Sequence, residues 1–227
     1  LEQQAEGEWK LRIGDFSMSN GVHRRPINCI FIAIHGAPGE TGQLQGFLDL
    51  HAIPYTGSNV CSSAISMNKH ICKYIVQSKC QIKTPRDILI PNGSTIQDPE
   101  ELGLISFPSI VKPNSYGSGI NVRLVTSMHA LVRAIEVIQQ TDQDVLIEEH
   151  ITGREITVGA ISLNGDIEVF PIIKVDRPEE NTVITASDDI LFTDRQQARL
   201  SVMEDIDQRV NDYIQQVTRD IGKALGC

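Results

Sequence analysis

The sequence lacks several features that would place it in common classes of protein. It contains no run of about 18 apolar residues, so we expect no transmembrane helix and no membrane association. Basic residues are in deficit: 20 Lys and Arg stand against 29 Asp and Glu, a net charge of −9 that argues against binding to nucleic acid or to an acidic membrane. Residues 1–10 are charged and have no apolar centre, so we expect no signal peptide there.

Cysteine is scarce and irregularly spaced. The chain has 5 cysteines, an odd number, and no Cys-x-x-Cys pair. This pattern argues against a disulfide framework or a zinc site and is typical of a reducing cytosol, so we expect a cytoplasmic location. With 227 residues, 41% of them apolar, the chain is long enough to bury the core of one large domain or two small ones.

One stretch carries the clearest chemistry. Residues 110–111 (Ile-Val) predict a short strand that leads into Lys112, and Pro113 then ends the ladder pairing. A loop of small residues follows at 114–119, before apolar residues alternate again at 120–124. The pattern therefore predicts a hairpin whose tip lies close against a ligand.

The glycines of this loop, Gly117 and Gly119, flank Ser118. Because glycine has no Cβ, backbone N–H groups can approach phosphate oxygens there, and Lys112 would supply a cation. The loop is not a P-loop, since no Gly-Lys-Ser/Thr and helix follow, and it does not match the Gly-x-Gly-x-x-Gly turn of dinucleotide folds. The alternative is an ordinary hairpin with a glycine turn and a surface lysine.

The N-terminal part of the chain predicts an open α/β sheet. Residues 28–34 are almost continuously apolar, which predicts a strand buried on both faces of a parallel sheet. A glycine-rich turn at 35–42 follows the C-terminal end of this strand, where ligands bind in such sheets. We expect a helix from Gln43 and a short strand and turn at 53–57.

The next segment, residues 58–78, has a helical pattern that Lys69 interrupts. Lys69 is either a solvated helix lysine or a phosphate cation at a domain junction. The elements expected after it are a strand ending at Ile90, a helix over 128–138 capped by Thr126 or Ser127, a strand at 145–147, a hairpin of 155–161 with 167–173 around Asn164-Gly165, an irregular polar loop at 176–189, and one amphipathic helix over 200–225.

Five motifs occur along the chain in the order in which they occur in one known family. They are His-Gly-Ala-Pro-Gly-Glu-Thr-Gly-Gln-Leu-Gln-Gly at 35–46, Ile-Pro-Tyr-Thr-Gly-Ser at 53–58, Ser-Met-Asn-Lys at 66–69, Ile-Val-Lys-Pro at 110–113 and Val-Leu-Ile-Glu-Glu-His-Ile-Thr-Gly-Arg-Glu-Ile-Thr-Val-Gly at 145–159. Together they resemble the D-alanine–D-alanine ligases of the ATP-grasp superfamily. The resemblance covers the chain from about Trp9 to Cys227, apart from the polar loop.

The resemblance implies an α/β ATP-grasp fold with an N-terminal parallel-sheet (pre-ATP-grasp) domain. We expect this first domain at 1–62, incomplete at its start, a central ATP-grasp subdomain at 63–147, and a truncated C-terminal ATP-grasp subdomain at 148–227. It also implies a homodimer.

The resemblance further implies that ATP lies between two antiparallel sheets. Lys69 and Lys112 would bind its phosphates, Glu148 would accept from the adenine amino group, the backbone near Ile151 would pair with the ring edge, and Glu155 would hold the ribose hydroxyls. The alternative for Glu148 and Glu155 is a pair of exposed carboxylates at strand ends. The implied nucleotide-binding residues are Lys69, Lys112, Gly117, Ser118, Gly119, Glu148, Glu149, His150, Ile151 and Glu155.

Three residues are implied in the chemistry at the first D-alanine: His35, Glu40 and Ser118. A carboxylate suits the ammonium group of the amino acid, and the serine helps to position it. The alternative is that His35 only caps the strand end and that Glu40 faces solvent. The implied reaction uses ATP to activate the carboxylate of one D-alanine as an acyl phosphate, which the amine of a second D-alanine attacks. Its product serves peptidoglycan precursor synthesis.

The sequence departs from the family pattern in several places. Thr41 stands where the family usually has aspartate, Gly119 stands where it has a second serine, and 176–194 contains no tyrosine of the family's lid segment. The strands that carry the family's Mg²⁺ ligands are expected beyond Cys227, so we name no metal ligand in this chain and expect the chain as written not to form a peptide bond. The departures keep two alternatives open: a ligase for other amino acids, and a nucleotide-binding relic without catalysis.

Overall fold

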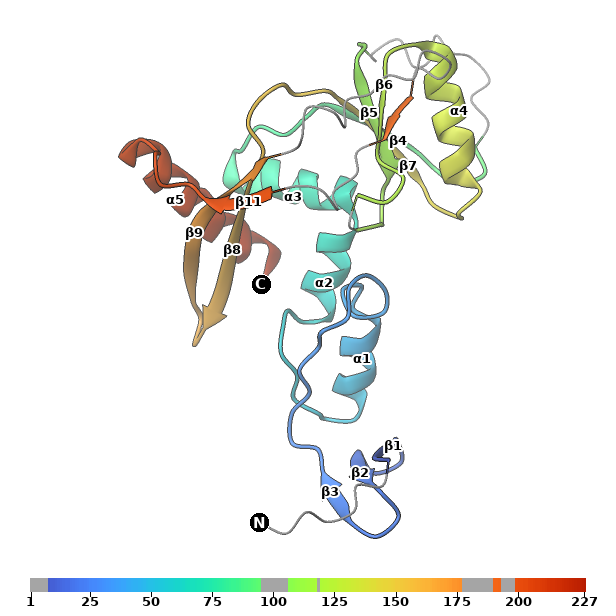
Figure 1. Ribbon diagram of the computed structural model, residues 1–227, viewed down its shortest axis with the longest axis vertical. Coiled ribbons are helices and arrows are strands. Elements are labelled where there is room, and N and C mark those ends of the chain that lie inside the picture. Colours follow the sequence, from blue (N-terminus) through green and yellow to red (C-terminus); the bar gives the residue numbers. More distant parts are fainter. Residues whose placement is uncertain (1–7, 95–105, 118, 177–189, 193–198) are drawn as a thin grey trace.

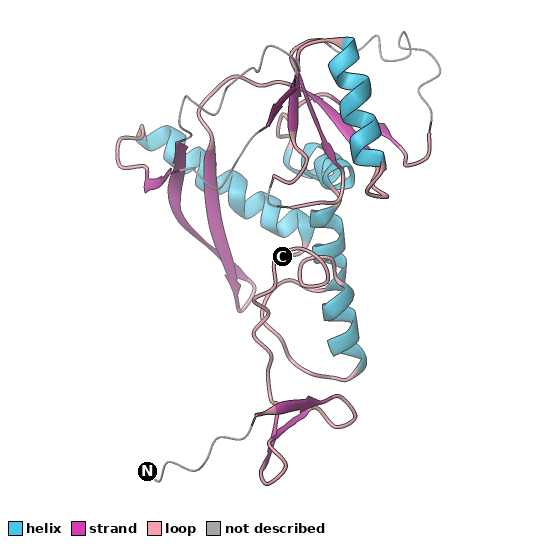
Figure 2. Ribbon diagram, turned by 45° about the vertical axis from the view of Figure 1, so that its right-hand side comes forward, coloured by secondary structure: helices cyan, strands magenta, loops and turns pink. Residues whose placement is uncertain are grey.

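The computed structural model describes residues 8–94, 106–117, 119–176, 190–192 and 199–227 (Figure 1). A small sheet near the N-terminus lies at one end of the molecule and a larger sheet covered by a helix lies at the other. Helices α1 (Gln43–Leu50), α2 (Val60–Met67) and α3 (Lys69–Cys80) connect them (Figures 1 and 2). Helix α5 (Gln208–Leu225) packs against both the third sheet and α3. None of the described helices combines the length and the apolar composition needed to span a membrane.

The N-terminal sheet is an antiparallel meander that we did not predict. Its strands are β1 (Lys10–Arg12), β2 (Ser17–Ser19) and β3 (Arg24–Pro26), in the order β1-β2-β3. Phe16, which is buried, joins this sheet to α1: its ring lies 5.7 Å from that of Phe47 and 4.6 Å from that of His51. The strands are too short to show an alternating apolar pattern, so the sequence carries little signal for them.

The strand expected at 28–34 does not form as predicted. The segment makes one parallel bridge, between Ile30 and Tyr55, and the Ile30 N–H donates to the Pro54 carbonyl at 2.9 Å. Phe31 is 77% exposed. A strand buried on both faces needs partner strands on both edges and layers over both faces, and among the described residues only the 53–57 segment lies alongside. Neither the strand predicted at 28–34 nor the one predicted at 53–57 forms, so both predictions and the predicted burial are wrong; only the single bridge between the two segments has the predicted parallel direction.

The helix expected over 58–78 is two helices, α2 (Val60–Met67) and α3 (Lys69–Cys80), which follow the predicted α1 (Gln43–Leu50). The backbone leaves the helical region at Asn68 (φ −84°, ψ 99°), and the Asn68 side chain caps α3 by accepting from the Ile71 N–H at 3.0 Å. This break makes Lys69 the first residue of α3.

The central sheet is antiparallel, in the order β10-β6-β5-β7-β4. Its strands are β4 (Asp87–Ile90), β5 (Ser109–Pro113), β6 (Arg123–Val125), β7 (Val145–Glu149) and β10 (Ile190–Phe192), the last of which we did not predict. The predicted helix is α4 (Met128–Gln139), capped by Ser127, and its apolar stripe packs on the sheet. The core formed there includes the fully buried Val111, Leu131, Ile138 and Val145.

The predicted glycine hairpin joins β5 to β6. Its second strand begins at Arg123 and not at Ile120, because 119–121 form a turn in which the Val122 N–H donates to the Gly119 carbonyl at 3.2 Å. Gly119 has φ 71°, a conformation that other residues adopt only with strain.

The third sheet has the order β11-β9-β8, from β8 (Ile156–Leu163), β9 (Asp166–Asp176) and β11 (Arg199–Val202). The predicted hairpin at Asn164-Gly165 is confirmed, with φ 54° and 90° as a two-residue turn requires. The helix expected over 200–225 is α5 (Gln208–Leu225) and begins later than predicted. Asp207 caps it, and residues 199–202 pair with β9 instead. Most of the polar loop at 176–189 lies outside the described residues.

Candidate functional site

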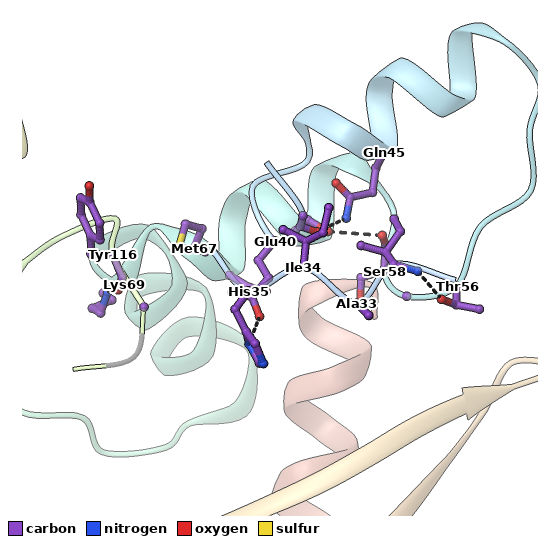
Figure 3. A pocket seen from close by; sticks show the side chains of 16 residues that line it. Ala33, Ile34, His35, Glu40, Gln45, Thr56, Ser58, Met67, Lys69 and Tyr116 are labelled. Carbon is purple, nitrogen blue, oxygen red and sulfur yellow. Dashed lines mark hydrogen bonds and ion pairs between the residues drawn. The ribbon is translucent and has the colours of Figure 1, made fainter. Parts of the chain in front are cut away.

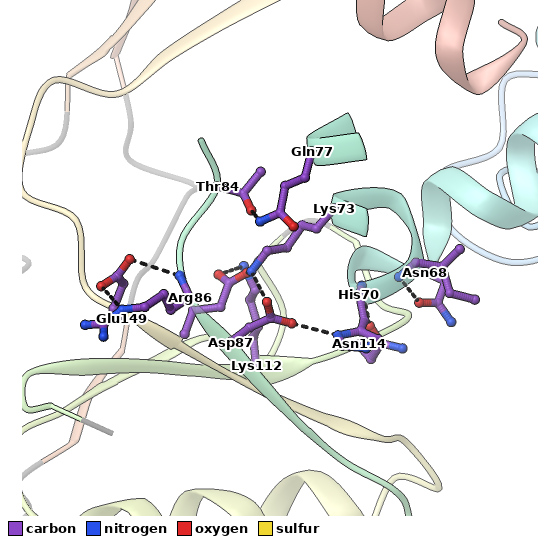
Figure 4. A network of polar contacts seen from close by, with 12 residues as sticks. Asn68, His70, Lys73, Gln77, Thr84, Arg86, Asp87, Lys112, Asn114 and Glu149 are labelled. Atoms are coloured by element: carbon purple, nitrogen blue, oxygen red, sulfur yellow. Dashed lines mark hydrogen bonds and ion pairs between the residues drawn. The ribbon is translucent and has the colours of Figure 1, made fainter. Parts of the chain in front are cut away.

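A buried set of charged side chains links α3 to three strands of the central sheet (Figure 4). The carboxylate of Glu148, on β7, is 7% exposed and receives Lys73 Nζ on Oε1 at 2.8 Å and Lys112 Nζ on Oε2. Lys73 Nζ also lies 2.9 Å from Asp87 Oδ1, and His70 Nδ1 lies 2.7 Å from Asp87 Oδ2. We call these five residues the α3 ion-pair network.

The charge of Asp87 is favoured within this network. Burial raises the pKa of its carboxyl, but hydrogen bonds from Lys73 and His70 and the charges of both side chains lower it by more, so the net pKa lies below the ordinary value. Glu149, next to Glu148, is held differently. Hydrogen bonds from the Arg86 backbone N–H (2.9 Å) and Nε (3.0 Å) lower the pKa of its carboxyl.

The first turn of α3 meets the end of β5. The Lys69 N–H donates to the Asn114 carbonyl at 3.1 Å, and the His70 N–H donates to Asn114 Oδ1 at 3.0 Å. Lys69 Nζ donates to the Asn114 carbonyl at 3.3 Å and to the carbonyl of Tyr116. The ammonium of Lys69 is therefore held where β5 passes into the glycine loop.

A cavity of about 630 Å³ brings together four residues that the sequence predicted separately: His35, Glu40, Lys69 and Gly117 (Figure 3). Glu40 Oε2 accepts from the Gly36 N–H at 2.7 Å, and Glu40 Oε1 lies 3.7 Å from His35 Nδ1. A Cβ added to Gly117 would lie 3.9 Å from Glu40 Oε2. The carboxylate expected at the substrate thus faces the loop expected at the phosphates.

The turn that carries Glu40 is tightly built. A Cβ on Gly39 would lie 2.5 Å from the Ile34 carbonyl oxygen, and Gly42 has φ 83° with the Val60 carbonyl 2.6 Å from its would-be Cβ. The buried Gln45 side chain donates from Nε2 to the Gly39 carbonyl at 2.6 Å. These contacts explain why this turn is rich in glycine: a side chain would collide with the neighbouring backbone.

Two further cavities, each of about 290 Å³, are lined by three more of the predicted nucleotide residues. Glu148 and Glu149 line the first, together with Asp87, Ile88, Ser109 and Ile147. Glu155, which is exposed, lines the second with Lys174 and Asp176. The two cavities share no lining residue, so the structure does not bring Glu155 to Glu148.

The remaining predicted residues are placed as follows. The His150 N–H donates to the Pro108 carbonyl at 3.4 Å, and the Ile151 side chain is exposed. Ser118 lies outside the described residues. Within the described chain, no three His, Cys, Asp or Glu side chains are grouped so as to hold a metal ion.

Sequence reasoning missed His70, Lys73 and Asp87. A signal was present for Lys73, which follows Lys69 by four residues and so shares its side of α3. No local signal pairs Lys73 with Glu148, which lies 75 residues further along the chain.

The fold and site together define a class of protein. The chain matches the structure of the D-alanine–D-alanine ligase of Bacillus anthracis, solved in complex with ATP (30% identity, TM-score 0.70, covering 87% of this chain and 60% of that one). It also matches the ligase of Coxiella burnetii (25% identity, TM-score 0.75, covering 96% and 57%). The fold is therefore α/β ATP-grasp, as predicted.

Family models narrow the class. The model described as "D-ala D-ala ligase C-terminus" matches residues 90–227, and the one described as "D-ala D-ala ligase N-terminus" matches residues 4–58. The chain belongs to the D-alanine–D-alanine ligase family.

Curated relatives agree with this assignment. The chain is 35% identical over 161 residues to the D-alanine–D-alanine ligase of Phocaeicola vulgatus, covering 71% of this chain and 49% of that protein. It is 30% identical over 213 residues to the ligase of Bacteroides fragilis, covering 94% and 64%. The chain spans about half the length of the first of these relatives.

Proposed function

We propose that this protein is an ATP-dependent ligase that joins two D-alanine molecules through an acyl phosphate, for peptidoglycan precursor synthesis. The observation that carries the proposal is the order of groups along β5 and its loop. Glu148 lies beside Lys112 near the start of this path, Lys69 Nζ contacts the Tyr116 carbonyl further on, and Gly117 lies beside Glu40 at the end. Adenine, phosphates and an amino-acid substrate would be met in that order.

The nucleotide would occupy this path as follows. The cavity that Glu148 and Glu149 line would take the adenine ring, and Glu148 would accept a hydrogen bond from its amino group. Lys112 and Lys69 would bind the phosphates, and the amides of the Gly117 loop would lie over them. Catalysis of phosphoryl transfer consists mostly of positioning and charge stabilisation, which cations and amides supply.

The amino-acid substrate would occupy the cavity of about 630 Å³. The Glu40 carboxylate would pair with the ammonium group of the first D-alanine. A carboxylate oxygen of this D-alanine attacks the γ-phosphorus of ATP, and ADP leaves. The amine of the second D-alanine then attacks the acyl carbon, which releases phosphate and a proton and forms the peptide bond.

Other properties of the whole protein belong to the same proposal. The 5 cysteines are free thiols, which supports a reducing, cytoplasmic location. The homodimer, the use of Mg²⁺, the residue roles above and the domain limits at 62 and 147 come from the resemblance and stay predictions.

A second candidate is a ligase for other amino acids, and Thr41 favours it. Thr41 stands where the family usually has aspartate, and its Oγ1 donates to Gln43 Oε1 at 3.1 Å. Both residues line a cavity of about 680 Å³ that shares His35 and Gly117 with the first cavity. Because threonine carries no negative charge, this cavity would attract the ammonium group of an amino acid less strongly than one with aspartate at this position, and the preferred substrate would change.

The test measures binding of a panel of amino acids in the presence of a non-hydrolysable ATP analogue, and phosphate release with ATP. We expect D-alanine to tighten analogue binding, L-alanine not to do so, and Glu40→Gln to remove the effect of D-alanine while leaving binding of the analogue intact. A response to a different amino acid would support the second candidate. Analogue binding that no amino acid changes would reject both and indicate a nucleotide-binding relic.

A further inference from the structure

The two lysines on Glu148 are not equivalent. Lys73 Nζ bridges two carboxylates, at 2.9 Å from Asp87 Oδ1 and 2.8 Å from Glu148 Oε1, and its side chain is 13% exposed. Lys112 contacts Glu148 only, among the ion pairs of the described residues, and its side chain is 20% exposed. Lys73 is therefore the more firmly held of the two cations.

The charge balance of the α3 ion-pair network limits which lysine is able to leave Glu148. With Lys73 and Lys112 positive and Asp87 and Glu148 negative, the four charges balance. A buried carboxylate without a cation is costly. If Lys112 turns to another anion, Glu148 stays compensated only because Lys73 remains on its other oxygen, while His70 remains on Asp87.

We propose that Lys73 is a positioning residue of the nucleotide site: it holds Glu148 and Asp87 in place so that Lys112 is able to leave Glu148 and bind the phosphates of ATP. This inference rests on the proposed nucleotide site. Lys73 Nζ is held between the carboxylates of Asp87 and Glu148, so it would act on the nucleotide site through Glu148.

The proposal makes a specific prediction for phosphate binding. Without Lys73, Lys112 becomes the only cation on a buried carboxylate and is held there. Any ligand that recruits Lys112 then binds less tightly, even one without adenine. Inorganic tripolyphosphate is such a probe, because it offers phosphate oxygens and cannot contact Glu148 as an adenine ring would.

The experiment measures the dissociation constant of tripolyphosphate by calorimetry for the 227-residue chain and its variants. We expect Lys73→Met to weaken binding about tenfold, the usual order for a lost charge-assisted contact. Lys79→Met, the matched control, removes an exposed lysine of α3 and should leave binding unchanged. The double variant Lys73→Met/Glu148→Gln should bind within about threefold of the wild type, because a neutral Glu148 no longer retains Lys112.

Two results would overturn the inference: Lys73→Met weakening binding no more than Lys79→Met, or a folded double variant that binds as poorly as Lys73→Met alone. The second result would give Lys73 a merely structural role. If Lys73→Met does not fold, Asp87→Asn replaces it. When residue 87 is neutral, Lys73 pairs with Glu148 alone and compensates its charge more fully, so Lys112 is released more easily. Tripolyphosphate should then bind more tightly, and weaker binding would contradict the inference.

A failure of the proposed function looks different. Lys112→Met would then leave both ATP and tripolyphosphate binding unchanged, whereas a failure of the present inference leaves Lys112→Met defective and Lys73→Met normal.

Discussion

Asp87 tests whether the α3 ion-pair network stabilises the fold, and the perturbation is Asp87→Asn. The asparagine keeps the size and one acceptor oxygen of the side chain but removes the charge that faces Lys73 at 2.9 Å and His70 at 2.7 Å. Hydrogen bonds to charged groups contribute roughly 1.5–3 kcal/mol each, and burial of the carboxylate offsets part of that, so we expect the free energy of unfolding at neutral pH to fall by about 2 kcal/mol.

The shifted pKa of Asp87 determines how its contribution to the free energy of unfolding changes with pH. The pKa of Asp87 is lower in the folded chain than its ordinary value of 3.8. The stabilisation is therefore fully present above pH 3.8 and is lost as the pH falls through the lower, folded pKa. Denaturant unfolding of both proteins at pH 5 and pH 3 should show a smaller difference at pH 3 than at pH 5. A difference that stays constant to pH 3, or grows there, would refute the reasoning.

Two further predictions concern the core and the ribose contact. Leu131 is fully buried between α4 and the central sheet, so Leu131→Ala should lower the free energy of unfolding by about 2–5 kcal/mol, whereas the exposed Leu50→Ala should change it little; equal effects in thermal unfolding would place the core elsewhere. If Glu155 holds the ribose hydroxyls, Glu155→Gln should weaken binding of ATP much more than binding of 2′,3′-dideoxy-ATP, and equal losses would leave Glu155 as an exposed carboxylate.

Elements set by local pattern were predictable. Helix α4 has an apolar residue at every third or fourth position and a serine cap, and the hairpin of β8 and β9 has Asn-Gly at its turn. Both features act within a few residues, so periodicity and turn chemistry identify them without knowledge of the rest of the fold.

Elements set by distant partners were not predictable. The apolar helix pattern extends back to Leu200, yet residues 199–202 form β11 and pair with β9. Pairing with the free edge of β9 outweighs the helix propensity of these residues. The break at Asn68 interrupts an apolar stripe that continues on both sides of it. In the site, the motif pattern predicted Lys69, Lys112 and Glu148, but the pairing of Glu148 with Lys73 joins residues from separate elements that only the folded chain brings together.

The proposed binding of the ATP phosphates by Lys112 and Lys69 is tested most directly by the dissociation constant of ATP for alanine variants at these positions. Each charge-assisted contact is worth roughly 1.5–3 kcal/mol, so Lys112→Ala and Lys69→Ala should each weaken ATP binding by about tenfold or more. Lys79→Ala, on the exposed side of α3, should not. An unchanged dissociation constant in both the Lys112 and the Lys69 variant would contradict the account.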